Sequence, residues 1–247
     1  MPKTIILIPS RMSASRLPGK PLLKINGLSI ISHVFNKAKR TNIGRVVVCT
    51  EDDEIFKEVK SNGGEAVLTS DKHKSGSDRI LEGFKKLKID NVDYILNLQG
   101  DEPNIDENDI INLNNFMIKN NNKDIGTLAT KIKDDRILSN KNVVKVALKE
   151  KLSNENFPFA LDFARKDLSN KYENIYHHIG IYIYKVNVLE KFVNFDQTKN
   201  EIEYRLEQLR ALDNDIKINV ALAKSSPLGI VTEEDYLALK KIMEYKS

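Results

Sequence analysis

A basic loop near the N-terminus is the first segment whose residue types suggest chemistry. The segment IPSRMSASRLPGKPL follows a strand-like run and carries Arg11, Arg16 and Lys20. Its small residues let the backbone approach a ligand closely, and Pro18 and Pro21 stiffen it. Because Arg binds phosphate oxygens bidentately and Lys acts as a mobile point charge, this spacing predicts a triphosphate site. The GxxxxGK(S/T) and GxGxxG fingerprints are absent, and an exposed basic loop without function is the alternative interpretation.

An acidic pair closes a second strand-like run, in the segment LNLQGDEP. Mg²⁺ takes one or two carboxylates and completes its shell with water and substrate phosphates. Asp101 is therefore the predicted metal ligand, with Mg²⁺ as the predicted cofactor, whereas Glu102 could equally be a surface carboxylate. The triplet is weak on its own and gains weight from the basic loop.

The segment HKSGSDR has the composition of a ligand-binding turn. Ser75 and Ser77 offer hydroxyls, and Gly76 permits a close backbone approach. This composition suits recognition of a base or a ribose. The alternative is a helix start with Ser77 as the N-cap, and both interpretations can hold together.

The segment HHIGIYIY places polar and apolar residues in alternation. As a strand it would put His178, Gly180 and Tyr182 on one face, and three isoleucines on the core face. Such a polar row can hydrogen-bond a polyhydroxylated ligand, and a half-exposed strand edge is the alternative. His177 and His178 lack companions at zinc-like spacing, so a zinc site is not expected.

Strands and helices alternate through the first hundred residues, which predicts a doubly wound, mostly parallel α/β sheet of the Rossmann-like kind. Ligands of such sheets bind beyond the carboxyl ends of the strands, so the loops after Ile8, Thr69 and Leu98 matter most. The predicted strands are 4–9, 45–50, 65–69 and 93–100, and the predicted helices are 29–39, 52–63 and 77–88.

The second half predicts a smaller mixed or antiparallel inserted lobe, because its strands lack long helices between them. We expect one domain over 1–247 with this lobe at roughly 131–210, and an asparagine-rich surface segment at 112–123. The further predicted strands are 124–132, 142–149, 177–185 and 217–223, and the predicted helices are 201–212 and 233–245, the latter with Thr232 as N-cap.

Composition excludes several classes of protein. The net charge is only +4, from 39 basic and 35 acidic residues, and the one concentrated basic segment points to a small polyanion, so no nucleic-acid partner is expected. There is no apolar run that could cross a bilayer and no signal peptide, which predicts a cytoplasmic protein without membrane insertion. The single cysteine, Cys49, lies in a strand-like run and is expected to be a buried thiol.

Together these segments resemble the CMP-KDO synthetases (3-deoxy-manno-octulosonate cytidylyltransferases). The resemblance runs in order through the segments above and then through FALDFAR, HHIGIY, LEQLR and LGIVTEEDY. It implies a nucleotidyltransferase of GT-A-like fold that moves CMP from CTP to the anomeric C2 hydroxyl of KDO, releases pyrophosphate and serves lipopolysaccharide synthesis. It also implies a homodimer, which we expect to form through the region around 131–176.

The resemblance assigns roles to particular positions. Catalytic roles fall on Arg11, Lys20 and Asp101, and CTP would be bound by Arg11, Arg16, Lys20, Ser75, Gly76 and Arg79. The sugar would lie against Gln99, Arg165, His178, Tyr182, Glu207 and Gln208. Arg165 is the natural partner of the sugar carboxylate, because a guanidinium can pair bidentately with it.

The chain departs from the family pattern at two places. Val231 stands where the family has an aspartate that supplies a second metal carboxylate, so Asp101 would act alone or with Glu233 or Glu234. Lys166 and Asp167 replace the family's usual serine and Pro-rich run after Arg165. These departures leave two alternatives: the same chemistry on 8-amino-KDO or a related acidic sugar, and a non-catalytic protein that binds nucleotide sugars.

Overall fold

The computed structural model describes residues 2–13, 17–224, 226–227, 229–230 and 232–245. Its contacts divide the chain into two compact units. The first unit contains Met1–Ile110 and Pro227–Ser247, and the second contains Ile111–Ser226. The predicted lobe at 131–210 falls inside the second unit, which begins earlier and ends later in the sequence.

The first unit is built on a parallel sheet with strand order β6-β1-β4-β5. The described residues of β1 and β4 are almost all buried, because β-branched and apolar residues follow one another without alternation. The four strands are β1 (Thr4–Ser10), β4 (Val46–Thr50), β5 (Ala66–Leu68) and β6 (Tyr94–Asn97). The predicted doubly wound parallel arrangement is confirmed here.

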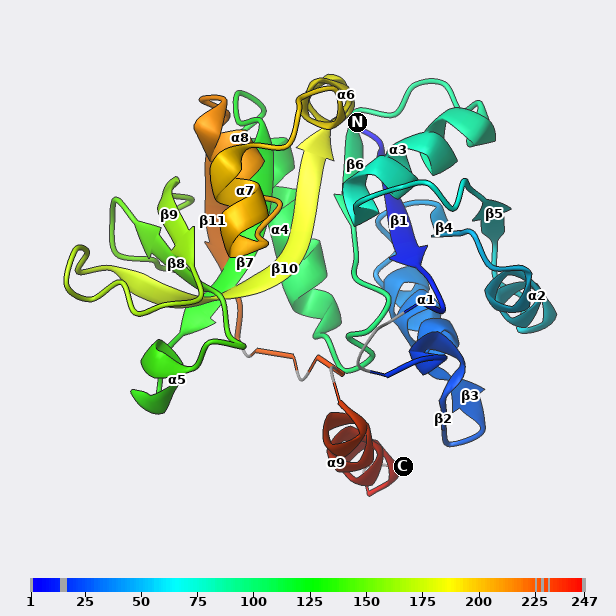
Figure 1. Ribbon diagram of the computed structural model, residues 1–247. Coiled ribbons are helices and arrows are strands. Elements are labelled where there is room, and N and C mark those ends of the chain that lie inside the picture. The colour runs from blue at the N-terminus through cyan, green and yellow to red at the C-terminus, as the bar shows by residue number, and fades with distance from the viewer. Residues whose placement is uncertain (1, 14–16, 225, 228, 231, 246–247) are drawn as a thin grey trace. The chain divides into compact units, whose positions relative to one another are not determined.

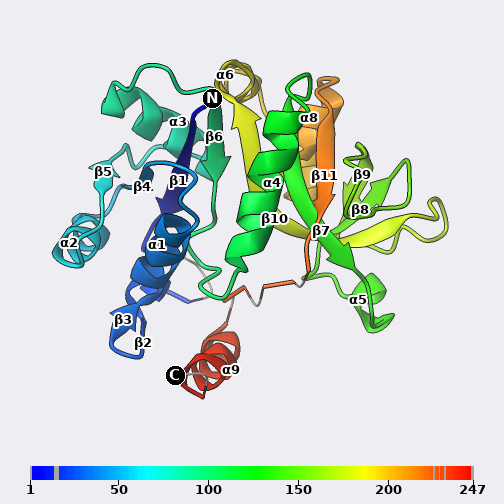
Figure 2. The same cartoon turned by 180° about the vertical axis from the view of Figure 1, so that it is seen from behind.

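Helices cover both faces of this sheet. Figures 1 and 2 place α1 (Ile30–Arg40) and α2 (Asp53–Ser61) on one face and α3 (Gly76–Leu87) on the other. Cys49 of β4 faces α3, where a side chain at Gly83 would collide with its sulfur. The predicted buried thiol is confirmed, and its burial raises the pKa of Cys49 to about 12.

The C-terminal helix packs on a small hairpin of the first unit. Helix α9 (Glu233–Glu244) starts at Thr232, whose side chain accepts from the Asp235 N–H in a capping box. Its Leu239 is fully buried in a cluster with Ile25 and Ile30. The other short elements here are the 3-10 helix η1 (Lys20–Leu22) and strands β2 (Lys24–Ile25) and β3 (Leu28–Ser29), and the longer helix α4 (Glu107–Lys119) leads into the second unit.

The second unit contains parallel and antiparallel strand pairs, as predicted for the inserted lobe. Strand β7 pairs parallel with β11 and antiparallel with β10, while β8 pairs antiparallel with both β10 and β9. The strands are β7 (Ile125–Lys131), β8 (Lys145–Leu148), β9 (Ala160–Ala164), β10 (Ile175–Lys185) and β11 (Ile218–Leu222). The helices are α5 (Arg136–Ser139), α6 (Val186–Val193), α7 (Lys199–Tyr204) and α8 (Leu209–Asp213).

The predicted single helix over 201–212 is wrong. The chain forms two short helices, α7 and α8, because Arg205 adopts the left-handed conformation with φ of 53° and ends α7. Leu206 then packs into the core with 4% exposure. The break puts Glu207 and Gln208 in the turn between the helices.

Three smaller expectations also need correction. Ser75, not Ser77, caps α3, and Ser77 is buried in the first helical turn. The segment 112–123 is not all surface, because α4 buries Leu113 and Met117 completely. The segment FALDFAR contains an additional strand, β9, whose alternation is too short to stand out from sequence alone.

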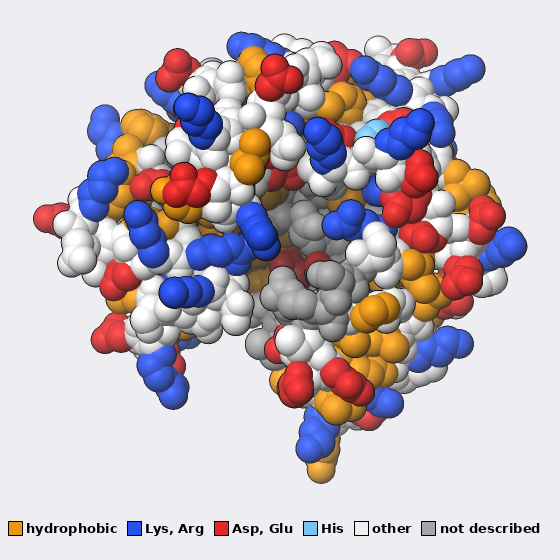
Figure 3. Space-filling view, viewed as in Figure 1, with side chains coloured by type: hydrophobic (Ala, Val, Ile, Leu, Met, Phe, Trp, Pro, Cys, Tyr) orange, Lys and Arg blue, Asp and Glu red, His pale blue; other side chains and the backbone are white. Residues whose placement is uncertain are grey.

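The charge distribution agrees with the composition. Basic and acidic side chains are both spread over the face of the molecule in Figure 3 and do not gather in one basic stripe. Among the described residues, no helix is both long enough and apolar enough to span a membrane.

Candidate active site

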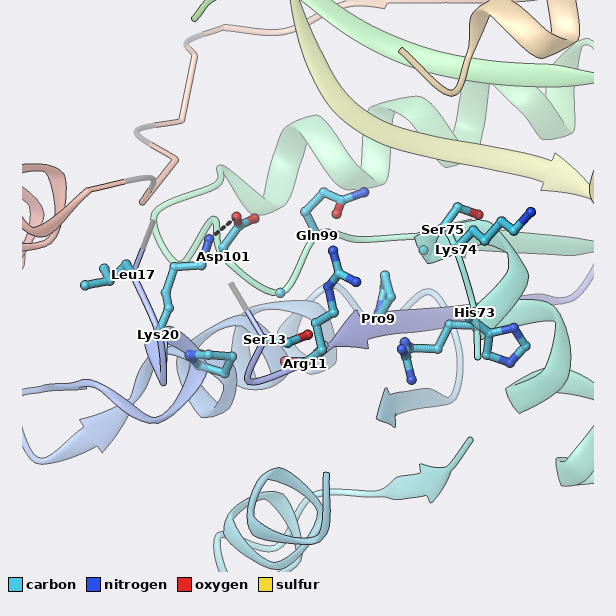
Figure 4. Close-up of a pocket in the computed structure, with 15 residues that line it drawn as sticks. Pro9, Arg11, Ser13, Leu17, Lys20, His73, Lys74, Ser75, Gln99 and Asp101 are labelled. Carbon is cyan, nitrogen blue, oxygen red and sulfur yellow. Dashed lines mark hydrogen bonds and ion pairs between the residues drawn. The ribbon is translucent and has the colours of Figure 1, made fainter. Parts of the chain in front are cut away.

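The first unit contains a cavity of about 480 Å³ at the carboxyl ends of its strands. That volume is within the usual range for a small-molecule site. All three loops singled out from the sequence contribute to it (Figure 4). The predicted residues in its lining are Arg11, Lys20, Ser75, Gly76, Arg79, Gln99 and Asp101.

The basic loop begins at the end of β1, and a backbone hydrogen bond between Met12 and Gly19 closes it. Arg11 is exposed and, in Figure 4, its side chain points toward Gln99. The Gly19 N–H donates to the Met12 carbonyl (3.3 Å), and Gly19 has a φ of 74°, which a residue with a side chain would adopt only with strain. Lys20 therefore leaves the loop at a fixed point. Arg16 lies outside the described residues.

Lys20 and Asp101 form the polar centre of the cavity. The Lys20 ammonium donates to Asp101 Oδ2 (2.6 Å) and to the Ile230 carbonyl (2.7 Å). Next to Asp101, Gly100 lies close to the end of β1, because a Cβ at that position would come within 3.0 Å of the Pro9 carbonyl oxygen. A cation and a carboxylate thus face the cavity together. Val231, which follows Ile230, lies outside the described residues.

The serine–glycine turn combines a helix start with a buried arginine. Ser75 accepts from the Asp78 N–H, and Asp78 accepts from the Ser75 N–H, so the turn is fixed by a capping box. Arg79 lines the cavity, but its side chain is only 3% exposed. Its guanidinium is held by Glu51, which follows β4, and donates to Thr69 Oγ1 (2.8 Å). Arg79 is thus positioned by the protein before any ligand arrives.

Glu102 is a buried carboxyl, not the surface group considered from sequence. Its Oε2 is inaccessible and has no hydrogen-bond partner in the part of the chain that the structure describes, although the residue as a whole is partly exposed. Burial, reinforced by the neighbouring Asp101 charge, raises the pKa of Glu102 to about 8. The cavity is thus lined by the Asp101 carboxylate, which pairs with Lys20, and the next residue in the chain is an acid with a buried oxygen.

The predicted sugar residues, apart from Gln99, lie in the second unit and are described within it. Arg165 follows β9 and donates to the Asn142 carbonyl (3.3 Å). Its own carbonyl accepts from the ammonium of Lys145, which is fully buried and also donates to Asn140 and Val143 (2.9 Å each). The backbone at Arg165 is consequently fixed on the core side.

His178 is a neutral, buried histidine. Its Nε2 lies 3.0 Å from Thr127 Oγ1, and that hydroxyl donates to the Ile181 carbonyl (2.7 Å), so the hydroxyl accepts from a protonated Nε2. Burial, with a small contribution from His177, lowers the pKa of His178 to about 3. Nδ1 is thereby assigned as a hydrogen-bond acceptor at neutral pH.

The irregular register of β10 keeps His178 and Tyr182 on one face. Two extra residues are inserted between Ile179 and Tyr182 relative to β7, which preserves the alternation of faces. The two rings are 5.5 Å apart. Burial, with the nearby charges of Tyr184 and Glu207, raises the pKa of Tyr182 well above its usual value, so its hydroxyl keeps its proton.

Glu207 and Gln208 are presented by the break between α7 and α8. Gln208 is buried at 8% exposure and sits at the N-terminal end of α8. The break is held by Arg210, which donates to both carboxylate oxygens of Glu201 (2.7 and 2.5 Å). Both members of this pair are nearly inaccessible.

Sequence reasoning identified the right segments but missed some of the residues within them. His73, Lys74, Ser10 and Ser13 also line the cavity. Among the described residues the buried Ser10 hydroxyl has no hydrogen-bond partner, and His73 is held by Glu82. The available signal was position, because all four residues lie within the two segments already identified. Glu51 and Asp52 come from a further loop at the same strand ends, after Thr50, which composition did not single out.

A parallel sheet with a polar cavity at the carboxyl ends of its strands is the architecture of an α/β protein that binds its ligand at that edge. A family model described as cytidylyltransferase matches residues 5–218. The chain belongs to the cytidylyltransferase family of enzymes.

Similar proteins are consistent with that membership. A 3-deoxy-manno-octulosonate cytidylyltransferase of Brucella ovis is 40% identical over 94% of this chain and 92% of its own. The protein so named from Nitrobacter hamburgensis is 40% identical over 98% and 93%. A solved structure of CMP:2-keto-3-deoxy-manno-octonic acid synthetase complexed with CTP has a TM-score of 0.90 and 31% identity, covering 99% of this chain and 100% of that one.

Proposed function

We propose that the protein transfers CMP from CTP to the anomeric C2 hydroxyl of KDO, giving CMP-KDO and pyrophosphate for lipopolysaccharide synthesis. The observation that carries the proposal is the cavity in which the basic loop, the Lys20–Asp101 pair and the Ser75–Arg79 turn meet. The similarity to the named cytidylyltransferases supports the choice of both substrates.

The nucleotide is assigned to this cavity. Arg11, Arg16 and Lys20 would bind the phosphates, and the turn from Ser75 to Arg79 would lie against the cytidine. Arg79, already fixed by Glu51, keeps its charge in place without reorganisation when the ligand binds. Attack of the sugar hydroxyl on the α-phosphorus needs no covalent intermediate, so positioning and charge neutralisation carry the catalysis.

The sugar is assigned to Gln99 and to residues of the second unit. Arg165 would pair with the C1 carboxylate, and His178 Nδ1 would accept from a sugar hydroxyl. The Tyr182 hydroxyl, which keeps its proton, is suited to donate. Glu207 and Gln208 would complete the set of hydrogen bonds to the remaining hydroxyls.

The donor set around Asp101 fits Mg²⁺. No group of three or more acidic, histidine or cysteine side chains among the described residues could hold a metal ion by itself. Asp101 lines the cavity and suits an ion that takes one or two carboxylates and otherwise binds phosphates and water. When bound, Mg²⁺ supplies charge neutralisation for the triphosphate. Glu233 and Glu234 begin α9 and are the nearest acidic residues in sequence to Val231.

The remaining features follow from the family resemblance. We infer a homodimer that forms through the region around 131–176, and a cytoplasmic location where CTP is available. Sedimentation velocity at micromolar concentration tests the dimer, and a monomer would contradict it.

A pyrophosphate-release assay with CTP, KDO and Mg²⁺ tests the proposed function. We expect release that depends on both substrates, that falls to background with ATP, GTP or UTP and that stops when EDTA removes the metal. Absence of release with CTP and KDO contradicts the proposal. No turnover with any acidic sugar would favour the non-catalytic binding protein instead.

A related acidic sugar is the second candidate substrate. The resemblance implies a serine at position 166, but this chain has Lys166. In the second unit its ammonium lies 5.9 Å from the centre of the Tyr204 ring. This replacement beside Arg165 changes the residues around the proposed carboxylate site. Comparison of kcat/KM for KDO and 8-amino-KDO decides between them, and a clear preference for KDO removes the alternative.

A further inference from the structure

Asp52 connects the end of β4 to the basic loop. The Met12 N–H donates to Asp52 Oδ2 (2.8 Å), a bond between residues 40 positions apart in the sequence. Asp52 itself is oriented by its own N–H, which donates to the fully buried Thr50 Oγ1 (3.1 Å). The backbone of Asp52 is thus bonded to Thr50 of β4, and its carboxylate binds the backbone of the basic loop.

Met12 is one of the two residues whose backbone hydrogen bond closes the basic loop, and Gly19 is the other. The Met12 N–H is bound by Asp52, and its carbonyl accepts from the Gly19 N–H. Lys20 follows directly and reaches Asp101. The bond to Asp52 therefore joins the start of the basic loop to the segment that follows β4, and we expect the position of the loop to depend on this carboxylate.

Asp52 does not perform the usual task of its position. It is the N-cap residue of α2, where an aspartate normally accepts from a helical N–H, yet it makes no side-chain capping bond. Asp53 and Glu54, in the first helical turn, supply the negative charge that favours a helix N-terminus. The geometry therefore assigns the Asp52 carboxylate to the loop and not to the helix.

The adjacent residue has a parallel task. Glu51 holds the Arg79 guanidinium of the serine–glycine turn. Two consecutive acidic residues after β4 therefore bind two segments that line the cavity. Asp52 binds the basic loop, and Glu51 binds the Ser75–Arg79 turn.

We propose that Asp52 is a positioning residue that holds the basic loop in place for the phosphates of the nucleotide. The inference rests on the proposed function, in that it takes CTP as the ligand of the loop. Asp52 acts through Met12 and does not itself contact the nucleotide.

The sign of the effect separates positioning from simple electrostatics. A carboxylate near a triphosphate site repels the ligand, so its removal without any structural role would tighten CTP binding. Removal of a loop anchor weakens binding, because the loop must then be ordered at the expense of binding free energy. The two explanations predict opposite changes in the KM for CTP.

The experiment compares three variants of the full chain. Asp52→Ala removes the anchor, Asp52→Asn keeps an oxygen that can accept from the Met12 N–H, and Asp53→Ala removes the same charge from the neighbouring, exposed position. We expect Asp52→Ala to raise the KM for CTP about tenfold, in line with loss of a charge-assisted hydrogen bond. The KM for CTP of Asp52→Asn should remain within about threefold of the wild-type value, and that of Asp53→Ala should match the wild type.

A second readout reports on the loop directly. Hydrogen exchange at the Met12 amide should accelerate in Asp52→Ala and stay slow in the other two variants, while the melting temperature and the KM for KDO stay close to those of Asp53→Ala. An unchanged or lowered KM for CTP in Asp52→Ala overturns the proposal, as does equal behaviour of the two alanine variants. A wild-type protein without CTP turnover refutes the proposed function instead, and unchanged exchange at Met12 would then still refute the anchor.

Discussion

At the scale of single residues, the cavity is defined by charges that the protein has already paired. Lys20 reaches both Asp101 and the Ile230 carbonyl, so its ammonium is ordered before any nucleotide binds. Ordered charges stabilise a transition state more effectively than mobile ones, since they need no reorganisation. The roles of Lys20 and Asp101 can therefore be tested by single substitutions.

Replacement of Lys20 by Met should lower kcat/KM for CTP by about 10²- to 10³-fold, because one preorganised cationic donor to the phosphates is lost. The matched control is Lys24→Met, which removes an exposed lysine four positions further on. The pyrophosphate assay measures both. Activity of Lys20→Met within threefold of the control would remove Lys20 from the catalytic site.

His178 predicts a pH dependence of stability. Its pKa of about 3 in the folded protein lies below the value of about 6.5 for an unfolded histidine. Between these values the unfolded state binds more protons, so stability falls as the pH falls through this window. From pH 6.5 to 5 the loss from this residue is about 2 kcal/mol. Urea unfolding of the wild type and His178→Gln over that range should give a shallower pH slope for the variant, and equal slopes would contradict the assignment.

At the scale of elements, the break between α7 and α8 determines where Glu207 and Gln208 lie. Arg205 ends α7 in the left-handed conformation, and the buried Glu201–Arg210 pair joins the two short helices. Arg210 also lies against the Phe192 ring of α6 (4.9 Å). A buried ion pair contributes little net stability, but removal of one partner leaves an uncompensated charge.

Glu201→Gln should therefore destabilise the protein by about 3–5 kcal/mol, since the Arg210 guanidinium would stay buried without its counter-charge. Glu203→Gln is the control, because Glu203 lies in the same helix and is exposed. Thermal unfolding measures both variants. A loss in Glu201→Gln no larger than in the control would show that the pair does not hold this break.

Element by element, the sequence predicted the regular structure well and the interruptions poorly. The parallel strands and their helices were evident from continuous apolar runs and from amphipathic spacing, as in α1 with its buried Ile31, Val34 and Phe35. The break at Arg205 was not evident from the sequence, because nothing in LEQLR departs from helical periodicity. It depends on Leu206 and on the buried ion pair, which are tertiary contacts.

The candidate site shows the same limit. The three loops of the cavity could be located from the strand-end rule, and Lys20 and Asp101 both line the cavity, although their ion pair was not predicted. The burial of Arg79, the buried carboxyl of Glu102 and the use of Asp52 as an anchor all depend on partners distant in sequence. Periodicity and composition carry no information about such partners.

At the scale of the whole molecule, most of the residues proposed for the two substrates belong to different units. The first unit contains the cavity proposed for the nucleotide, and the second contains the proposed sugar ligands around His178 and Arg165. A transferase must join the two substrates, whereas a hydrolase of CTP needs only the first set of residues. The product therefore distinguishes CMP transfer to KDO from hydrolysis of CTP.

Phosphorus NMR of a reaction with CTP, KDO and Mg²⁺ is the most direct test. We predict that the three CTP signals are replaced by one phosphodiester signal, from the CMP-sugar, and by pyrophosphate in equal molar amount, and that neither appears when KDO is omitted. Pyrophosphate accompanied by free CMP, or CTP that remains unchanged, would contradict the assignment of this protein as a CMP transferase for KDO.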